Sequence, residues 1–387
     1  MGNLQFFYCR IMNNFQLLKT DDKSKARAGV LKTDHSEILT PVFMPVGTLG
    51  TVKAIDPKFL YDRDTRIILG NTYHLYLRPG NEVIKHFGGL HKFMNWNNSI
   101  LTDSGGYQVF SLQDIRKIDE NGVKFKSHID GSSHYFTPQS VIETQRILGS
   151  DIMMVLDECV PYPSEHSYVK NSIELSLKWA KECKDYWVEK GPMWEHNQML
   201  FGITQGGTYK DLRKEYIARL IDIGFDNYAI GGLSVGEPAE VIYDLTDYST
   251  DYLPKDRARY LMGVGTPENI LECIERGIDM FDCVMPTRNA RNGQIFTTNG
   301  KVNIRNKKYQ LSEEPIDGGL DNYASQNFTL GYLRHLFIAN ETLALILASQ
   351  QNLAFYLWLT RTAREHILEG DFVEWKRGFL ENYNKKE

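Results

Sequence analysis

The sequence has few cysteines, and they are scattered. Only five occur among 387 residues, and no two of them form a CxxC pair: Cys9, Cys159, Cys183, Cys273 and Cys283. Such a pattern supports neither a disulfide framework nor a zinc site of four thiolates. We therefore expect a protein of a reducing compartment and predict a cytoplasmic location.

Long hydrophobic runs are also lacking. The most apolar long stretch, residues 342–360, is interrupted by the polar residues SQQN at 349–352, which would be costly in lipid. It is predicted to be a buried helix, and no membrane partner is expected. The first residues contain no small-residue cleavage site and make a poor signal peptide. We predict an N-terminal extension over residues 1–14, within which Met12 is as good an initiator as Met1.

The phosphate-binding fingerprint G-x-G-x-x-G follows none of the predicted strands. Its lack argues against a doubly wound nucleotide-binding sheet, although such an open sheet remains the alternative. Eight short apolar runs alternate with helical patterns, and they begin at Pro41, Arg66, Ser99, Asp151, Met199, Tyr228, Arg259 and Asp279. This alternation predicts an α/β protein built as an eight-stranded parallel β/α (TIM) barrel.

The segments between and after these runs complete the predicted organisation. Amphipathic helices are expected over residues 138–148, 172–188, 212–223, 238–248 and 267–276. Residues 122–137 alternate around a turn and predict an inserted β-hairpin. From residue 295 short pieces precede long helices over residues 329–370. We therefore expect a catalytic barrel over residues 15–294, then barrel closure and a C-terminal helical subdomain over residues 295–387.

The residues that end the predicted strands are candidates for chemistry, because the active site of a β/α barrel lies at those ends. They are Asp103, Asp157, Gln205, the Gly231-Gly232 pair, Met262 and Asp282. A single such Asp is as well explained by a helix cap. Three aspartates at one end of a barrel raise one another's pKa, which favours a functional role over helix capping. Two carboxylates can flank a glycosidic bond, which predicts a retaining glycosyl-transfer site or a barrel hydrolase of similar design.

The charge distribution adds one feature beside this mouth. With 44 basic and 49 acidic residues the formal net charge is −5, which argues against general coating of nucleic acid. Residues 283–312, however, contain no Asp or Glu and six basic residues: Arg288, Arg291, Lys301, Arg305, Lys307 and Lys308. A solvated basic loop is the alternative, but the position directly after Asp282 favours the positioning of phosphates.

Eight motifs in order resemble those of bacterial tRNA-guanine transglycosylases. They are TPVFMPVGT (from Thr40), GNTYHLYLRPG (Gly70), TDSGGYQVFSL (Thr102), DECVPYP (Asp157), GITQGG (Gly202), AIGGLSVGE (Ala229), LMGVGTPE (Leu261) and DMFDCVMPTRNARNGQ (Asp279). The resemblance extends from about residue 15 to 383. It implies a β/α barrel that exchanges the wobble guanine of GUN-anticodon tRNAs (Asp, Asn, His, Tyr) for 7-aminomethyl-7-deazaguanine in queuosine biosynthesis.

The resemblance also implies roles for individual residues. Asp282 resembles the nucleophile that forms a covalent glycosyl-enzyme, and Asp103 resembles the acid/base. The base pocket would contain Asp157, Gln205 and Gly232 at the base edge, Tyr107 and Met262 on the two ring faces, and Ser104, Cys159 and Leu233 around them. Arg288, Arg291 and Lys53 would contact tRNA. Val235, where relatives that insert queuine carry Gly, and Cys159 favour the aminomethyl base.

One departure from the family pattern concerns metal. The family has a structural zinc site, C-x-C-x-x-C with a later His, and the aligned positions here are Leu320, Asn322, Ser325 and Gln351. None can supply thiolate or imidazole. We therefore predict no zinc and no cofactor, and expect apolar packing by Leu320 and residues 330–338 in its place. A homodimer is expected from the resemblance.

Three alternatives are weighed against this interpretation. A non-catalytic paralogue would lack one catalytic Asp, whereas Asp103 and Asp282 are both present. A relative that acts on DNA, or one that uses queuine, remains the alternative for the substrate. The segment TRNARNGQ and Val235 favour tRNA and the smaller base.

Overall fold

The computed structural model describes residues 14–111 and 116–385. All but the last residue of the expected N-terminal extension, with Cys9 and both candidate initiators, therefore lies outside the described residues. Among the helices described, none is long and apolar enough to cross a membrane. The predicted buried helix over residues 342–360 is confirmed as part of α14 (Thr342–Glu369).

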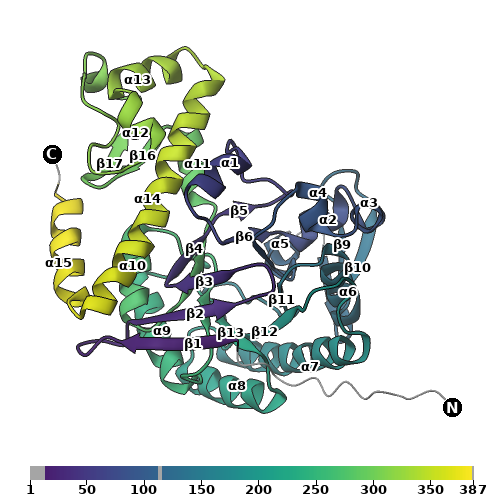
Figure 1. Cartoon of the computed structure of the whole chain (residues 1–387). Helices are drawn as coiled ribbons and strands as arrows, with labels where there is room; N and C mark the ends of the chain where they lie inside the picture. Colours follow the sequence, from purple (N-terminus) through teal and green to yellow (C-terminus); the bar gives the residue numbers. More distant parts are fainter. Residues whose placement is uncertain (1–13, 112–115, 386–387) are drawn as a thin grey trace.

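A closed parallel barrel forms the centre of the molecule (Figure 1), as predicted. The eight predicted runs become β4 (Val42–Met44) with β5 (Val46–Gly47), β6 (Ile67–Gly70), β7 (Ser99–Thr102), β11 (Ile152–Met154), β12 (Met199–Thr204), β13 (Asn227–Ile230), β14 (Arg259–Leu261) and β15 (Met280–Asp282). The first run pairs with β15 through β4 and with β6 through β5. Pro45, which has no N–H group, separates these two halves. Together the two halves close the barrel.

Helices cover the outside of this barrel. The five predicted ones are α6 (Pro138–Leu148), α7 (His166–Lys190), α8 (Lys210–Ile223), α9 (Ala239–Tyr252) and α10 (Pro267–Glu275). Two of them begin with proline after a threonine N-cap, as the helix-start signals predict. Shorter helices follow the first three strands: α1 (Pro57–Asp62), α2 (Thr72–Leu77), α3 (Asn81–Phe87), α4 (Leu90–Met94) and α5 (Gly106–Ser111).

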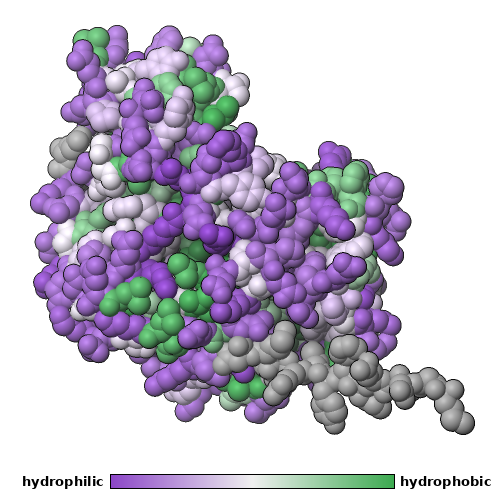
Figure 2. All heavy atoms as spheres, in the orientation of Figure 1, coloured by the Kyte–Doolittle hydropathy of each residue, from purple (hydrophilic) through white to green (hydrophobic). Residues whose placement is uncertain are grey.

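An antiparallel sheet before the barrel was not anticipated from the sequence. It consists of β1 (Phe15–Thr20), β2 (Arg27–Lys32) and β3 (Glu37–Thr40). It lies at the end of the barrel where the strands begin, because the buried Arg27 guanidinium pairs with Asp279, the residue before β15. Hydrophobic side chains gather over this sheet in Figure 2, and Leu18 and Leu39 are about half exposed.

The inserted segment lies at the opposite end. The predicted hairpin is confirmed as β9 (Gly122–Lys126) and β10 (Ser133–Phe136), but β8 (Arg116–Asp119) extends it to three strands. Its turn contacts the helix after β6, since the Tyr73 hydroxyl group lies 2.8 Å from His128 Nδ1. The insertion therefore borders the mouth.

The C-terminal part is built around α14. It contains α11 (Met285–Arg291), β16 (Gln294–Thr297), β17 (Gly300–Asn303), the 3-10 helix η2 (Lys307–Tyr309), α12 (Tyr323–Asn327), α13 (Leu330–Ile338) and α15 (Phe372–Tyr383). In Figure 1, α14 runs from this part down to the barrel. Adjacent residues on α14 bind different neighbours: Asn352 Nδ2 donates to the carbonyl groups of Pro286 and Gln294, and Gln351 Nε2 donates to that of Phe296.

The positions aligned with zinc ligands form a buried hydrogen-bond network. The Asn322 side-chain amide donates to Ser325 Oγ over 2.6 Å and to Gln351 Oε1 over 3.0 Å, and Ser325 Oγ also donates to Gln351 Oε1. Leu320 is 5 % exposed and packs in the main core. Zinc requires thiolate, imidazole or carboxylate ligands, so this set does not fit the ion. The expectation of apolar packing alone was incomplete, because three of the four positions are polar and bonded to one another.

Candidate active site

Asp103 lies directly after β7, at the mouth of the barrel. The backbone N–H groups of Thr72 and Gly105 donate to its Oδ1 over 2.9 and 3.1 Å, and the Asn71 amide donates to Oδ2. Burial raises the pKa of Asp103 to about 7; these hydrogen bonds oppose the rise, and the negative charge of Asp282 adds to it. Near neutral pH both protonation states of Asp103 are populated, which suits proton transfer in either direction.

Asp282 is the last residue of β15 and is partly exposed. The Tyr260 hydroxyl group and the Gly263 backbone N–H both donate to Oδ1, over 2.5 and 2.9 Å. Burial raises the pKa of Asp282, and these two hydrogen bonds counteract it. Since both donors hold Oδ1, Oδ2 is the oxygen that is available to a ligand.

Asp157 and Gln205 form a second polar pair, at the ends of β11 and β12. Gln205 Nε2 donates to Asp157 Oδ2 over 2.6 Å, and both side chains are buried. Burial raises the pKa of Asp157 to about 6. Among the described residues no hydrogen-bond partner reaches Gln205 Oε1. A ligand edge with both donors and acceptors can therefore be bound here.

The Gly231-Gly232 pair gives Gln205 its space. A Cβ atom on Gly232, whose φ is +65°, would lie 2.4 Å from Gln205 Oε1, and one on Gly231 would lie 2.8 Å from Nε2. The Gly232 backbone also hydrogen-bonds the Cys159 thiol group, whose pKa burial raises to about 12. Asp157, Gln205, Gly232 and Cys159 therefore form one continuous cluster, and Cys159 is not a thiolate.

A family model described as Queuine tRNA-ribosyltransferase matches residues 21–385. The chain belongs to this family. It is 56% identical over 369 residues to the queuine tRNA-ribosyltransferase of Caldanaerobacter subterraneus subsp. tengcongensis, covering 95% of this chain and 97% of that relative. The proteins of the same name from Nitratidesulfovibrio vulgaris and Staphylococcus epidermidis are 52% and 49% identical, over 94% and 95% of this chain and 96% of each relative. The chain is therefore an enzyme, a tRNA-guanine transglycosylase.

In this transglycosylase, the remaining candidates for the base pocket lie around the mouth of the barrel, as Asp103 and Asp282 do. Tyr107, in α5, is 55% exposed, whereas Met262, after β14, is half-buried. The strand order puts β7 and β14 on opposite sides of the barrel, so these two side chains approach the mouth from opposite directions. Ser104 and Leu233 are buried, and Ser104 Oγ accepts the Gly106 backbone N–H.

The tRNA-binding candidates lie on two segments after strand ends. Arg288 and Arg291 are on α11, directly after β15, and Lys53 follows β5 and is exposed. The pKa of His74 in α2 is lowered mainly by burial, and the positive charge of Lys53 contributes to the decrease. Lys53 therefore lies near His74, at the mouth of the barrel. The basic segment is not one uniform patch, however, because Lys301 pairs with Glu268 over 2.7 Å.

Three functional neighbours were missed by sequence reasoning. Asn71 directly follows β6 as the N-cap of α2 and could have been found by the same strand-end rule. Tyr260 lies within β14, and Arg213 lies in the amphipathic pattern of α8, where charged residues normally face solvent. Arg213 is fully buried and donates to the carbonyl groups of Gly207 and Gly231, over 2.7 and 3.1 Å. It therefore connects the loops that carry Gln205 and Gly232.

Proposed function

We propose that this enzyme exchanges the wobble guanine of GUN-anticodon tRNAs for 7-aminomethyl-7-deazaguanine by double displacement. The observation that carries the proposal is the pair of carboxyl groups in one mouth, Asp103 with a pKa raised to about 7 and Asp282 with both of its hydrogen-bond donors on Oδ1. The tRNAs are those for Asp, Asn, His and Tyr, and the reaction belongs to queuosine biosynthesis in the cytoplasm.

The reaction proceeds in two balanced steps. In the first, Asp282 Oδ2 attacks C1′ of the ribose, the bond from C1′ to guanine N9 breaks, and protonated Asp103 gives its proton to the departing base. In the second, ionised Asp103 takes the proton from N9 of the incoming base. That nitrogen then attacks C1′, and the ester bond to Asp282 breaks.

Recognition of the base uses the cluster around Gln205. The Asp157 carboxylate accepts hydrogen bonds from the N1–H and amino groups of guanine. The Gln205 side-chain amide and the Gly232 backbone N–H donate hydrogen bonds to guanine O6. Gln205 must then exchange its bond to Asp157 for one to the base. Tyr107 and Met262 hold the two ring faces, and Ser104, Cys159 and Leu233 line the pocket.

The smaller incoming base is supported by the space beside Val235. The cavity that Val235 and Gly232 line has a volume of only about 10 Å³, which barely holds one water molecule. The Glu237 carboxylate accepts the Val235 backbone N–H over 2.9 Å and fixes this loop. Val235 therefore limits the space next to Gly232, which favours the smaller base.

In this proposal the C-terminal part contains no zinc, because Asn322, Ser325 and Gln351 bond to each other in place of metal ligands. The proposed reaction also needs no cofactor. A chelator should leave exchange activity unchanged; activity that disappears and returns with zinc would contradict the proposal. The resemblance also predicts a homodimer, which light scattering with and without tRNA tests.

Exchange of labelled guanine tests the function directly. Incorporation is expected into tRNA transcripts with a GUN anticodon and not into transcripts with another anticodon. Asp282→Asn should abolish incorporation and the covalent tRNA adduct on denaturing gels, while tRNA binding persists. Asp103→Asn should abolish turnover. Exchange into duplex DNA, or full activity of Asp282→Asn, would overturn the proposal.

A further inference from the structure

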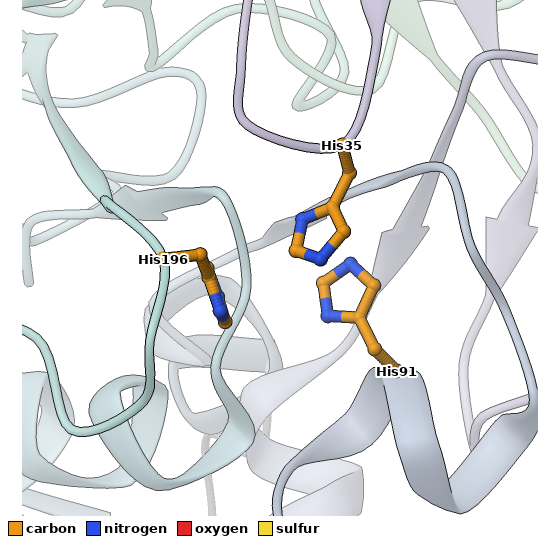
Figure 3. A group of neighbouring side chains, drawn as sticks. All are labelled: His35, His91 and His196. Carbon is orange, nitrogen blue, oxygen red and sulfur yellow. The ribbon is translucent and has the colours of Figure 1, made fainter.

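Three histidines meet at the end of the barrel opposite the active site. His35 is in the turn between β2 and β3, His91 is in α4, and His196 precedes β12. Figure 3 shows the three rings close together on these separate segments; the rings of His35 and His91 are stacked with centroids 3.9 Å apart, and that of His196 meets both edge to face. One nitrogen atom of each lies within 4.8 Å of those of the other two. The proposed reaction uses none of these residues.

The outer hydrogen bonds of the rings determine which nitrogen atom of each ring is free to bind a metal ion. His35 Nδ1 is 2.6 Å from Oδ1 of buried Asp151, and His91 Nε2 is 3.2 Å from its Oδ2. His196 Nε2 is 2.8 Å from the Gly149 carbonyl oxygen. Each acceptor holds a proton on the ring nitrogen that it contacts, so in the neutral rings the lone pair is on the other nitrogen. Carboxylate and carbonyl acceptors behind histidines are the usual second layer of metal sites.

One of these lone pairs has no partner. His91 Nδ1 is buried, and among the described residues nothing donates a hydrogen bond to it. A buried acceptor without a donor is unfavourable. Because Nδ1 carries the lone pair when Nε2 is protonated, a cation at this position would satisfy it.

We propose that His35, His91 and His196 bind one divalent transition-metal ion of the zinc or cobalt type. Three imidazole nitrogens select such ions over magnesium and calcium, which prefer oxygen. Tetrahedral coordination needs nitrogen atoms roughly 3.3 Å apart, and the stacked rings of His35 and His91 must turn out of parallel so that both lone pairs meet at the ion. Water completes the coordination.

The ion reaches the site from solvent and ties three segments together. The histidines border an open pocket of about 820 Å³ that Trp194 and Met193 also line. Coordination joins the β2–β3 turn, α4 and the segment before β12, so the ion stabilises the closed end of the barrel. It is remote from the mouth and leaves guanine exchange unchanged.

Titration of the full chain with Co²⁺ after removal of metal tests the proposal. We expect one ion per chain, the visible spectrum of four-coordinate nitrogen and oxygen ligation, and an increase of a few degrees in melting temperature at saturating metal. His35→Gln and His196→Gln should each lose this spectrum. His366→Gln is the matched control, because His366 belongs to another His and carboxylate group, with Glu369 and Asp371.

Three results would overturn the proposal: no stoichiometric binding, binding that only His366→Gln removes, or an unchanged cobalt spectrum in His35→Gln and His196→Gln. Circular dichroism establishes that the variants are folded. If the variants are not folded, the cobalt spectrum of the wild-type protein tests the proposal. A near-ultraviolet cobalt–thiolate band would assign the ion to cysteine ligands and overturn it.

Discussion

The Tyr260 hydroxyl group donates a hydrogen bond to Oδ1 of Asp282 over 2.5 Å. Tyr260 is fully buried, and burial raises its pKa well above the usual value, so it remains a donor at any working pH. The bond stabilises the carboxylate form of Asp282 and fixes its orientation. Tyr260, inside β14, thereby holds Asp282, at the end of β15, in one charge state and orientation.

Replacement of Tyr260 tests this relationship. Tyr260→Phe should lower kcat by about 10- to 160-fold, because loss of one hydrogen bond to a charged group costs about 1.5 to 3 kcal/mol. The KM for tRNA should change little. Tyr228→Phe is the control, since Tyr228 is a buried tyrosine of neighbouring β13 that does not contact Asp282. Equal kcat values in both variants would contradict the role of Tyr260.

The pH dependence should follow two raised pKa values. Asp157, with a pKa of about 6, must be ionised to accept from guanine, so kcat/KM for tRNA rises with pH through that value. Asp103, with a pKa of about 7, must be protonated to release guanine, so kcat/KM falls as pH rises above it. We expect a bell-shaped profile with a narrow maximum between the two. A profile that is flat from acidic to alkaline pH would exclude these assignments.

Because Gly232 lies against Gln205 and a Cβ atom at Gly236 would contact no described residue, we expect alanine substitutions at these two glycines of one loop to differ in their effect on base binding. Gly232→Ala should reduce kcat/KM for guanine at least about 10-fold, because its Cβ would clash with Gln205 and displace a hydrogen bond to the base. Gly236→Ala is the matched control: φ is +124° there, and no atom lies within 4 Å of the added Cβ. Similar kinetics of the two variants, with melting temperatures compared, would contradict a role of this space in base binding.

Removal of positive charge from α11 should change the salt dependence of tRNA binding. The double variant Arg288→Ala with Arg291→Ala should lower the slope of log affinity against log salt by about 1.4 to 1.8, from about 0.7 to 0.9 for each phosphate contact. Lys301→Ala is the control, because Lys301 is already paired with Glu268. An unchanged slope in the double variant would show that α11 does not contact phosphates.

The buried network of the C-terminal part should contribute to stability. Gln351→Leu leaves donors on Asn322 and Ser325 and the Phe296 carbonyl group without their partner, so we expect a loss of about 1 to 3 kcal/mol in the free energy of unfolding. Gln350→Leu, one position away and partly exposed, should have a small effect. Chemical denaturation measures both. A stable Gln351→Leu variant would mean that apolar packing alone holds this region.

The barrel was predictable because its signal is repeated. Eight buried runs alternate with helices, and several of them end in polar residues. Parallel strands necessarily bring such ends together, so Asp103, Asp157 and Asp282 could be expected at one mouth. The sheet over residues 15–40 was not predictable in this way. Its first strand is mostly exposed and gives little apolar alternation.

The missed residues share a physical reason. Arg213 has the spacing of a surface position, and only the carbonyl groups of two other loops explain its burial. In the same way, Gln351 is 26 residues from Ser325, and loss of the zinc ligands gave no indication that it would bond to Asn322 and Ser325. Contacts between distant loops are not encoded in local periodicity.

The pairing of β4 with β15 sets an order for the folding of the newly made chain. Val42 pairs with Met280, so the first barrel strand has one unpaired edge until the ribosome has released the eighth. Helix α14, which packs against β4, is synthesised later still. Asp282 enters the barrel only with that last strand. Closure over so long a loop is slow, so we expect nascent chains that stop before residue 280 to have no enzyme activity and to need protection from aggregation.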